Sequence, residues 1–355
     1  MSVYRAIAIP LDGADCDVER LMALANLVYR GYLIKPPDLP ASAYYELESW
    51  RWKNSLVFGS TPKRWLAGVW FPMRVQRCIN GSVKGTNAST AVVDFDYGVI
   101  RFRSVCHAQL PIPKWLHERI AEGGDVKQAL LGLKGGKPYL AIVVERPYKS
   151  LESSGYTLVV DVNSWRHGVV VGLITPKGKI AMLRRVRPNL RKMDGLYGQI
   201  ARVERKLGAT KRLGLMAEVK RLRKIARKLK HKLYLYLKDF VNKAVHEIVS
   251  IALRYNAKVV IDDIVEESRR KLLEEGLPNG IHKLYFVYIR RFVGLLVNQA
   301  KWYSLPVEFK RLNSTVCPTC GARLEQRESR LMVCPNCGFR ANRDEVPIYW
   351  AIKLH

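Results

Sequence analysis

Residues 156–172 read YTLVVDVNSWRHGVVVG, and this stretch decides the fold of the second half of the chain. The apolar run at its start predicts a buried strand that carries Asp161 near its end. A second strand follows over residues 168–183, where PKGK predicts the turn of a hairpin. KVVIDDI (258–264) predicts another buried strand that ends on carboxylates. Two buried strands ending on acidic residues indicate an α/β domain with polar groups at one sheet edge.

A long helical segment, residues 193–255, separates these strands in the sequence and predicts a hairpin of two helices. Between Arg184 and Lys232 the chain carries 18 Lys or Arg and only three acidic residues. Apolar residues recur there every three or four positions, so one face packs and the other is positive. A solvated helix face is the alternative, but such a face normally includes more acidic residues. We therefore predict nucleic-acid contacts from Arg184, Arg185, Arg187, Arg191, Lys192, Arg202, Arg205, Lys206, Lys211, Arg212, Arg221 and Lys224. After the third strand we expect an amphipathic helix over residues 283–303 and a strand over 305–312.

The first 150 or so residues predict a mixed α and β region. Residues 3–10, 90–96, 99–104 and 139–146 have the pattern of strands, and residues 18–32 that of a helix. Residues 42–78 show helical periodicity with Trp50, Trp52, Trp65 and Trp70 among Arg and Lys. Aromatic and cationic side chains together offer stacking and phosphate contacts to RNA, and core tryptophans with exposed arginines are the alternative. A small β-barrel with a helical insertion fits this pattern.

The composition favours a nucleic-acid partner. The 355 residues include 60 Lys and Arg against 31 Asp and Glu, which gives a net charge of +29. Nucleic acid and an anionic membrane surface are the commonest partners of so basic a chain. No apolar run reaches the roughly 18 residues of a membrane span, and the N-terminus lacks the pattern of a signal peptide. We expect a cytoplasmic protein that binds nucleic acid and no membrane.

Four of the seven cysteines form two CxxC pairs, Cys317 with Cys320 and Cys334 with Cys337. Two such pairs place four thiolates around one tetrahedral Zn²⁺, and Gly follows each pair where a tight turn is needed. Four protein ligands leave no open position, so this zinc is structural. A redox dithiol is the alternative, but nothing nearby is typical of a thioredoxin unit.

Three aspartates are placed to hold catalytic metal: Asp161, Asp262 and Asp344. Asp161 and Asp262 lie at strand ends. Asp344 follows the segment with the four cysteines, a zinc ribbon, and precedes a short apolar helix. Phosphodiester hydrolysis by two Mg²⁺ ions needs several carboxylates that converge on cations about 4 Å apart. A single aspartate at a strand end is more often a turn or helix cap. The three aspartates in this order favour a metal site, and Asp263 is expected on the opposite face of its strand.

The stretches VVDVNSWRHGVVVG, KVVIDDI and NSTVCPTCG…CPNCGFRANRDEV resemble the three RuvC motifs and the zinc ribbon of TnpB proteins. TnpB proteins are OrfB products of insertion sequences and are related to compact type V CRISPR effectors. The resemblance covers about residues 156–355, and the N-terminal region is similar only in general plan. It implies an RNase H-like RuvC core with an inserted zinc ribbon, preceded by a wedge-type β-barrel with a helical recognition insert, so an α/β and α+β multidomain protein.

The resemblance also implies a function. TnpB proteins bind a guide RNA from the element's end and cut double-stranded DNA that matches it beside a short adjacent motif. The resemblance implies that two Mg²⁺ ions are held by an Asp–Glu–Asp triad, whose positions correspond to Asp161, Asp262 and Asp344 here. It also implies one structural Zn²⁺ in the ribbon. The family's serine and threonine before the first knuckle fall on Ser314 and Thr315, and its basic residue near the active site is Arg330, a further nucleic-acid contact. We expect one protein chain per guide RNA, in the nucleoid of a prokaryotic cell.

This sequence departs from the TnpB pattern at two places. The middle carboxylate is Asp262 rather than Glu, so it reaches about one methylene less far, and active sites are sensitive to shifts of about 1 Å. After Asp344 the usual Asn-Ala pair is replaced by Glu345-Val346-Pro347. These departures support a second hypothesis, an RNA-guided DNA-binding repressor that cuts poorly. A guide-independent DDE-type transposase is a third, and a ribbon between the second and third carboxylates argues against it.

We predict four domains. Residues 1–150 form the wedge barrel, with its recognition insert at about 16–80. Residues 151–312 form the nuclease core, with the basic helical hairpin at about 190–255. Residues 313–340 form the ribbon, and residues 341–355 carry the last motif and a terminal helix.

Overall fold

The computed structural model describes residues 2–11, 70–73, 75–85, 91–102, 109–134, 137–163, 167–263 and 282–353, with four single residues between 12 and 69. The chain divides into two compact units, Met1–Tyr148 and Lys149–His355, and each is described by itself. The fold is mixed α/β. Most of the predicted helix over residues 18–32 and the tryptophans Trp50, Trp52 and Trp65 lie outside the described residues.

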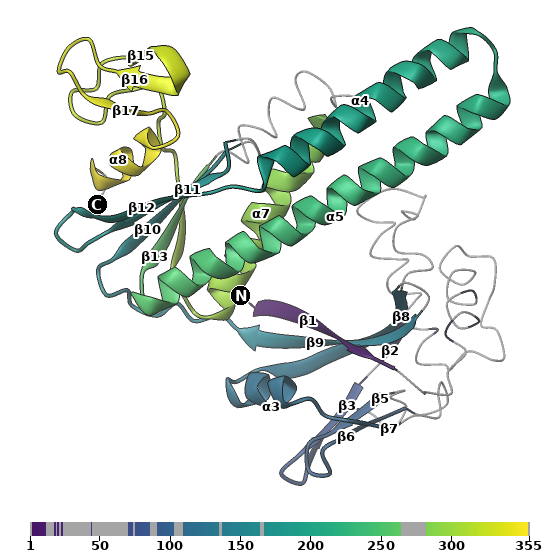
Figure 1. The fold of residues 1–355 in the computed structure, drawn as a ribbon. Coiled ribbons are helices and arrows are strands. Elements are labelled where there is room, and N and C mark those ends of the chain that lie inside the picture. The colour runs from purple at the N-terminus through teal and green to yellow at the C-terminus, as the bar shows by residue number, and fades with distance from the viewer. Residues whose placement is uncertain are drawn as a thin grey trace. The chain divides into compact units, whose positions relative to one another are not determined.

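Unit 1 contains two sheets (Figure 1). One sheet has the order β1-β9-β8-β2, and its strands are Ser2–Pro10, Lys137–Pro147, Asp125–Lys134 and Trp70–Met73. The other has the order β4-β3-β5-β6-β7, with strands Ser82–Lys84, Val75–Ile79, Ala91–Asp94, Val99–Phe102 and Gln109–Pro111. Helix α3, Lys114–Ala121, precedes β8. The predicted strands 3–10, 90–96, 99–104 and 139–146 are confirmed, whereas closure into a wedge barrel stays a prediction.

Helical periodicity over residues 42–78 is wrong for its last part, which forms β2 and β3. Trp70 pairs with Gly132 in an antiparallel ladder, and Val75 pairs with Ala91 in a parallel one. Aromatic and β-branched residues are favoured in strands, and partners distant in the sequence decide between the two structures. The spacing of aromatics therefore could not reveal the strands.

Unit 2 is built on a five-stranded sheet of order β12-β11-β10-β13-β14. Strands β10 (Thr157–Val162), β11 (Val169–Ile174) and β12 (Ile180–Val186) are antiparallel neighbours. Strands β13 (Lys258–Asp262) and β14 (Val307–Lys310) run parallel to β10. The predicted strands and the hairpin turn at residues 176–179 are confirmed. The parallel pairing brings the ends of β10 and β13 to one edge.

The two faces of this sheet are covered by different helices (Figure 1). Helices α4 (Leu190–Arg212), α5 (Met216–Arg254) and α7 (His282–Trp302) pack against one face, through a core that includes Leu158, Val160 and Ile261. Helix α8 (Val346–Lys353) covers the other face and contacts Val159 and Val260. Both faces are therefore buried, which accounts for the uninterrupted apolar runs.

A three-stranded ribbon sheet lies between β14 and α8 in the chain. Its order is β15-β16-β17, with strands Glu325–Gln326, Leu331–Val333 and Arg340–Asn342. A turn at Glu328–Arg330, in which Ser329 has a φ of +52°, leads into β16. Gly172 in β11 lets α8 approach the sheet, because a Cβ there would lie 2.1 Å from Cγ2 of Ile348. This close packing fixes where the segment before α8 meets the sheet.

Candidate functional site

The four cysteines of the ribbon come together as two matching turns. In the first, the N–H of Cys317 donates to Ala322 O at 2.8 Å, and Gly321 N–H donates back to Cys317 O at 3.0 Å. Cys334, Phe339 and Gly338 repeat this pattern in the second turn. Both glycines have positive φ, +78° and +75°, which an L side chain rarely adopts. The backbone alone therefore holds each CxxC pair in a metal-binding turn.

The thiols have the geometry of one zinc site. All four sulfur atoms lie within 4.8 Å of one another. The Sγ–Sγ distance is 3.5 Å between Cys317 and Cys337 and 3.4 Å between Cys320 and Cys334. A tetrahedron with Zn–S bonds of about 2.3 Å has edges of about 3.8 Å, so a small adjustment would seat the ion. The donor set and its size therefore fit Zn²⁺.

The electrostatics of the cluster also call for a cation. The backbone N–H of Ala322 and the thiol of Cys334 lower the pKa of Cys320 to about 6. For Cys337, the N–H of Phe339 lowers the pKa, but burial and the other thiols outweigh it and raise the pKa to about 12. The thiols thus resist ionising together, and a divalent cation removes that repulsion.

The ribbon is anchored to α8. Nε1 of Trp350 donates to Val316 O at 2.6 Å, next to the first cysteine. The rings of Phe339 and Tyr349 meet edge to face at 5.4 Å. Val346 is buried in the same apolar cluster as Met332 and the buried cysteines. Because α8 packs on the sheet, the ribbon fixes the segment that carries Asp344.

The three aspartates meet on the face of the sheet that α8 covers. Side chains alternate along a strand, so Asp161 lies on the same face as Val159, and Asp262 on the same face as Val260. Both valines pack against α8 in one cluster. Asp344 lies two residues before that helix begins and is 1% exposed. Asp161 is also buried, at 4% exposed, so carboxylates from three elements converge here.

The acidity of Asp161 reports on this surrounding. Burial and the nearby charges of Asp262 and Asp344 raise the pKa of Asp161 to about 8. Nδ2 of Asn163 donates a hydrogen bond to Oδ2 of Asp161, which opposes the rise. The charge of Arg330 also opposes the rise but does not outweigh burial and the two carboxylates, so a bound cation would stabilise the ionised form of Asp161.

Asp344 is held by two arginines. Nη1 of Arg185 donates to Oδ2 of Asp344 at 2.9 Å, and Nη2 of Arg185 donates to Asn342 Oδ1 at the same distance. Arg330 donates from Nη2 to the other carboxylate oxygen. The Arg185 side chain is only 17% exposed and also lies 3.5 Å from Glu345. Arg185 thus ties β12 to the chain just before α8.

Arg330 occupies an unusual backbone position at the edge of the ribbon. Its φ is +67°, and its carbonyl accepts a hydrogen bond from Arg343 N–H at 2.9 Å. Nη1 of Arg330 lies 3.4 Å from Nε2 of His167, and burial together with the Arg330 charge lowers the pKa of that histidine. A neutral imidazole is thus favoured beside the aspartates.

Asp262 and Asp263 are placed differently. The N–H of Leu312 donates to Oδ1 of Asp262 at 2.8 Å, so the end of β14 helps to orient the middle carboxylate. The N–H of Asp263 donates to Lys310 O at 3.1 Å, and Asp263 follows the last residue of β13, so its place on the other face stays a prediction. The role at this position is therefore proposed for Asp262 alone.

The aspartates have the right chemistry for Mg²⁺ but are less tightly gathered than the cysteines. Within the described parts of the chain, the cysteine set is the one group of three or more ligand side chains whose atoms all lie within 4.8 Å. Oxygen donors suit Mg²⁺, which prefers carboxylates and keeps several waters in its shell. The donor set thus fits the ion, while Arg185 and Arg330 hold Asp344 in a salt-bridged position.

The predicted nucleic-acid contacts are mostly exposed on α4, α5 and the segment before them. Arg184 pairs with Glu247 of α5, and Arg221 with Glu218, while Arg185 and Arg330 turn toward Asp344. The remaining exposed cations of the predicted set are Arg187, Arg191, Lys192, Arg202, Arg205, Lys206, Lys211, Arg212 and Lys224. The hairpin therefore presents a long positive surface, and two predicted contacts lie at the aspartates instead.

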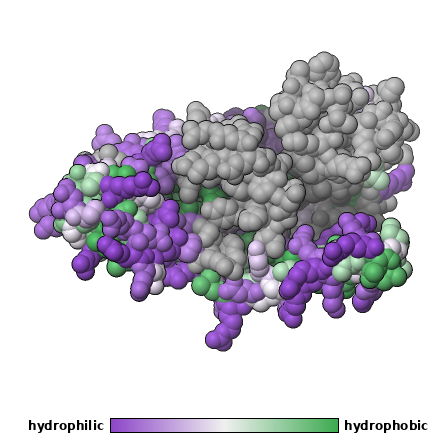
Figure 2. Space-filling model, turned by 90° about the horizontal axis from the view of Figure 1, so that it is seen from above, coloured by the Kyte–Doolittle hydropathy of each residue, from purple (hydrophilic) through white to green (hydrophobic). Residues whose placement is uncertain are grey.

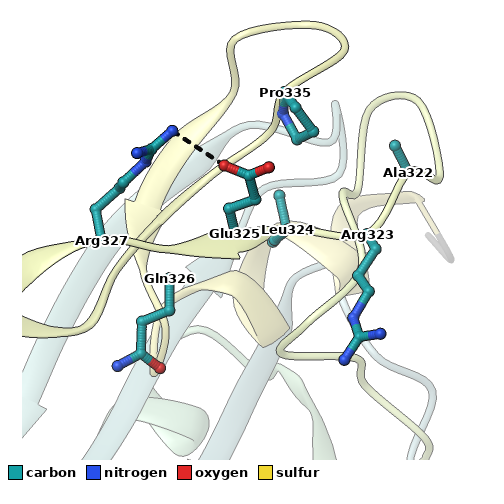
Figure 3. Close-up of a pocket in the computed structure, with 7 residues that line it drawn as sticks. All are labelled: Ala322, Arg323, Leu324, Glu325, Gln326, Arg327 and Pro335. Atoms are coloured by element: carbon teal, nitrogen blue, oxygen red, sulfur yellow. Dashed lines mark hydrogen bonds and ion pairs between the residues drawn. The ribbon is translucent and has the colours of Figure 1, made fainter.

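The ribbon also forms a hollow of about 690 Å³, away from the aspartates (Figure 3). Arg327 donates to Glu325 at 3.0 Å beside it, and Arg323 points away from that pair. The hollow is open and is lined by neighbouring residues of one strand and turn, so the aspartate face is the stronger candidate for chemistry. Of the family positions before the first knuckle, Ser314 is half-buried and Thr315 accepts at its carbonyl from Leu324 N–H.

The sequence did not reveal three polar neighbours of the aspartates: Asn163, His167 and Asn342. Asn163 and Asn342 each lie two residues from an aspartate, and that spacing is the only signal that points to them. His167 is brought to Arg330 by the tertiary fold. Among the described residues, no helix has the length and apolarity that a membrane span requires.

Comparisons with known proteins agree with the motifs. A family model described as the Cas12f1-like TNB domain matches residues 290–347. TnpB-like protein MJ0751 of Methanocaldococcus jannaschii is 25% identical over 115 residues, which are 32% of this chain and 41% of that protein. The chain thus spans less than half of the length of this curated relative.

A solved structure with a similar backbone is the cryo-EM structure of the Cas12f1–sgRNA–target DNA complex. The TM-score is 0.47 at 11% identity, and the match covers 95% of this chain and 80% of that one. A backbone similarity at this level adds nothing to the assignment. The family model over residues 290–347 and the curated relative, taken with the motifs, support a relationship of this chain to TnpB-like proteins and the type V effectors.

Proposed function

We propose that this chain is an RNA-guided DNA endonuclease that cuts double-stranded DNA matched to its guide RNA beside a short adjacent motif. The observation that carries the proposal is the meeting of Asp161, Asp262 and Asp344 on the sheet face covered by α8. The similarity of the chain to Cas12f1-like and TnpB-like proteins also supports a nuclease function. The reaction is hydrolysis of a phosphodiester bond.

The strand order supports an RNase H-like RuvC core. Three antiparallel strands are followed by two parallel ones, and the first strand lies at the centre of the sheet between β11 and β13. This order puts the ends of β10 and β13 side by side, where two of the carboxylates are needed. In this proposal unit 1 is the wedge domain that holds the RNA scaffold and inspects the adjacent motif.

The aspartates would hold two Mg²⁺ ions, which supply charge neutralisation and water activation when bound. Asp161 offers its carboxylate from the centre of the sheet, and Asp262, which Leu312 N–H helps to orient, offers its carboxylate at the end of β13. Asp344 gains freedom to turn toward the other two when Arg330 leaves it. A scissile phosphate is the natural competitor for Arg330, since Arg binds phosphate oxygens as well as it binds carboxylates.

Zn²⁺ at the ribbon would have no part in the chemistry. Four cysteine ligands close its coordination shell, so it can accept neither water nor phosphate. Its role is to fix the ribbon, and through Trp350 and Val346 the ribbon sets the start of α8. Zinc thereby orders the segment that brings Asp344 to the sheet.

The basic hairpin would grip the duplex of guide and target by its backbones. In guided nucleases base pairing reads the sequence, and the protein needs mainly positive charge along the groove. The exposed cations of α4 and α5 meet that need. One protein chain per guide RNA is the proposed assembly.

The test begins with the RNA that copurifies with the protein. Sequencing should find one dominant RNA with a fixed scaffold and a variable end. In EDTA, the complex should then bind DNA that matches this end more tightly than a shuffled sequence. Protein that purifies without RNA, or that binds matched and shuffled DNA alike, would overturn the proposal.

A guided binding protein that represses without cutting is the second candidate. The specific observations in its favour are the shorter Asp262 and the two arginines that already engage Asp344. Both candidates predict guided binding in EDTA, so only cleavage in Mg²⁺ separates them.

A further inference from the structure

The turn that joins α4 and α5 carries exposed apolar side chains at the far end of the hairpin from the sheet (Figure 1). Leu213 is 72% exposed, Leu215 is 54% exposed and Met216 is 69% exposed. Val219, one turn later in α5, is only 1% exposed. The hairpin therefore buries Val219 without burying Leu213, Leu215 or Met216. Folding of the hairpin does not explain why they are apolar.

The turn is ordered by its backbone. Gly214 has a φ of +70°, its N–H donates to Lys211 O at 3.2 Å, and Leu215 N–H donates to Thr210 O at 3.3 Å. This pair of hydrogen bonds is the Schellman motif that ends many helices. The N–H of Val219 donates to Leu215 O at 3.0 Å and starts α5 directly. The three apolar side chains are thus presented on a fixed turn, so little ordering entropy is lost when they bind.

Positive charge surrounds this apolar turn. Residues 202–224 contain nine Lys or Arg and two Glu, a net charge of +7, and all nine cations are exposed. Residues 213–217, in the middle, carry no charge. Figure 2 shows hydrophilic residues on the right of the face it displays, with a small hydrophobic group at the right-hand end. The combination fits a partner that has anionic strands and an apolar end.

The spread of the charge favours nucleic acid over a membrane. Helix α4 has 23 residues and is about 34 Å long, and exposed cations lie along most of its length and that of the facing part of α5. A membrane that meets the turn end-on would attract mainly cations within a screening length of about 8 Å. A nucleic-acid strand that follows the hairpin meets the whole row. Three side chains also offer little area for membrane insertion.

We propose that Leu213, Leu215 and Met216 form a wedge that packs on an exposed nucleobase at the end or junction of a duplex. Leu and Met are among the side chains that proteins insert at base steps, where they replace stacking that the end of the duplex has lost. The flanking cations hold the adjoining phosphates. The inference rests on the proposed function only in its choice of a nucleic-acid partner, and the aspartates play no part in it.

The test compares two RNA probes on the full-length protein after bound nucleic acid has been removed in high salt. One is a hairpin RNA with a single-stranded extension and 2-aminopurine at the junction, and the other is a closed dumbbell RNA without exposed ends. The triple variant Leu213→Ser, Leu215→Ser, Met216→Ser should bind the junction probe about tenfold more weakly, since a stacked base contributes on that scale. Its binding to the dumbbell and its salt dependence should match those of the wild type.

The matched control removes charge instead of the apolar surface. Lys211→Gln with Arg212→Gln should weaken binding to both probes and lower the salt slope by about 1 to 2. In the wild type, the 2-aminopurine fluorescence should change on binding, and the triple variant should lose that change. The single variant Met216→Phe should keep or strengthen the fluorescence change of the wild type, because the larger apolar ring still packs on a base.

Three results would overturn the wedge. One is that the triple variant binds both probes more weakly by the same factor, and another is that its binding to both probes is unchanged. The third is normal RNA binding by the triple variant with lost binding to phosphatidylglycerol vesicles, which would assign the turn to a membrane surface. A wild-type protein that binds neither RNA would instead contradict the proposed function, so the two failures are distinguishable.

Discussion

The cysteine cluster and the aspartate cluster lie on either side of α8, and the chain assembles them by different means. Two local turns, each closed by its own backbone hydrogen bonds, gather four thiols within 4.8 Å of one another. The aspartates come from β10, β13 and the segment before α8, and the fold of the whole sheet brings them to one face. The first site is built by sequence neighbours, and the second by topology.

The two clusters also differ in how the charges of their ligand groups are satisfied. The cysteine site has its full ligand set and the dimensions of a zinc tetrahedron. In the aspartate site, Asp344 forms salt bridges with Arg185 and Arg330, and the pKa of Asp161 is raised to about 8. In the proposed function the aspartate site exchanges water, phosphate and metal, so the arginines that hold Asp344 must be replaceable, whereas the cysteine site needs no such exchange.

The largest effect is expected at the centre of the aspartate cluster. Asp161→Ala should lower the rate of matched-DNA cleavage by at least about 10³-fold, because the proposed metal ligand at the end of β10 is lost. Binding of RNA and DNA should not change. The measurement is single-turnover cleavage by the purified complex in Mg²⁺.

Asp263→Ala is the matched control for this variant. Asp263 directly follows Asp262 and β13, and we expect its side chain to point away from the other aspartates, so its loss should change the rate by no more than about threefold. Cleavage by Asp161→Ala at the wild-type rate would remove the triad from the account.

The second prediction concerns the cysteine site. Cys334→Ser should lose the zinc and lower the unfolding temperature by at least about 5 °C, because ion binding contributes to the stability of the ribbon. Elemental analysis and differential scanning fluorimetry measure the two effects. Cys78→Ser, in unit 1, should keep one zinc per chain. A zinc content of one in Cys334→Ser would argue against the ribbon site.

The third prediction concerns the link between the two sites. Arg185→Gln should reduce cleavage about tenfold, as changes around metal ligands commonly do, because Asp344 and Asn342 lose a shared donor. The cleavage rate of Arg185→Lys should lie between those of the wild type and Arg185→Gln, since Lys cannot form both bonds at once. Arg184→Gln is the control, because that arginine pairs with Glu247 on the other face. Equal effects of Arg184→Gln and Arg185→Gln on cleavage would contradict this role.

The smallest effect is a pH dependence of stability in the metal-free protein. The pKa of Asp161 is raised in the folded state, so the fold binds a proton that the unfolded chain releases between about pH 4 and pH 8. Stability from this group is therefore present at low pH and is lost as the pH rises toward 8. Asp161→Asn should unfold about 3–6 °C above the wild type at pH 8, with a smaller difference at pH 5.

Thermal unfolding in EDTA across this pH range measures the difference. Mg²⁺ should reduce it at pH 8, since the cation stabilises the wild-type carboxylate and not the amide. A difference that stays constant from pH 5 to pH 8 would show that Asp161 does not titrate as described.

The sequence predicted much of unit 2 for identifiable reasons. Strands β10 and β13 are buried on both faces, so they read as apolar runs that end on Asp161 and Asp262. The cysteine turns are local, so spacing alone predicts them. The helical hairpin of α4 and α5 was predicted within a few residues of its ends, because its apolar periodicity is long.

Other features depend on contacts that no local pattern contains. The sequence places Arg184 and Arg185 in one basic run, but the register of β12 turns Arg185 to Asp344 and Arg184 to Glu247. Trp70 pairs with a strand that follows much later in the chain, and its aromatic spacing was misread as helical. Partners across a sheet, rather than neighbours in sequence, decide these positions.

The most direct test of the account is cleavage by the wild-type complex. Protein purified with its RNA is incubated with DNA that matches the guide and carries a randomised flanking segment, in Mg²⁺ or in EDTA. We predict that matched DNA beside one short motif is cut in Mg²⁺ and stays intact in EDTA. Tight binding of matched DNA that remains intact in Mg²⁺, whatever the flanking sequence, would contradict it and assign the protein to guided repression.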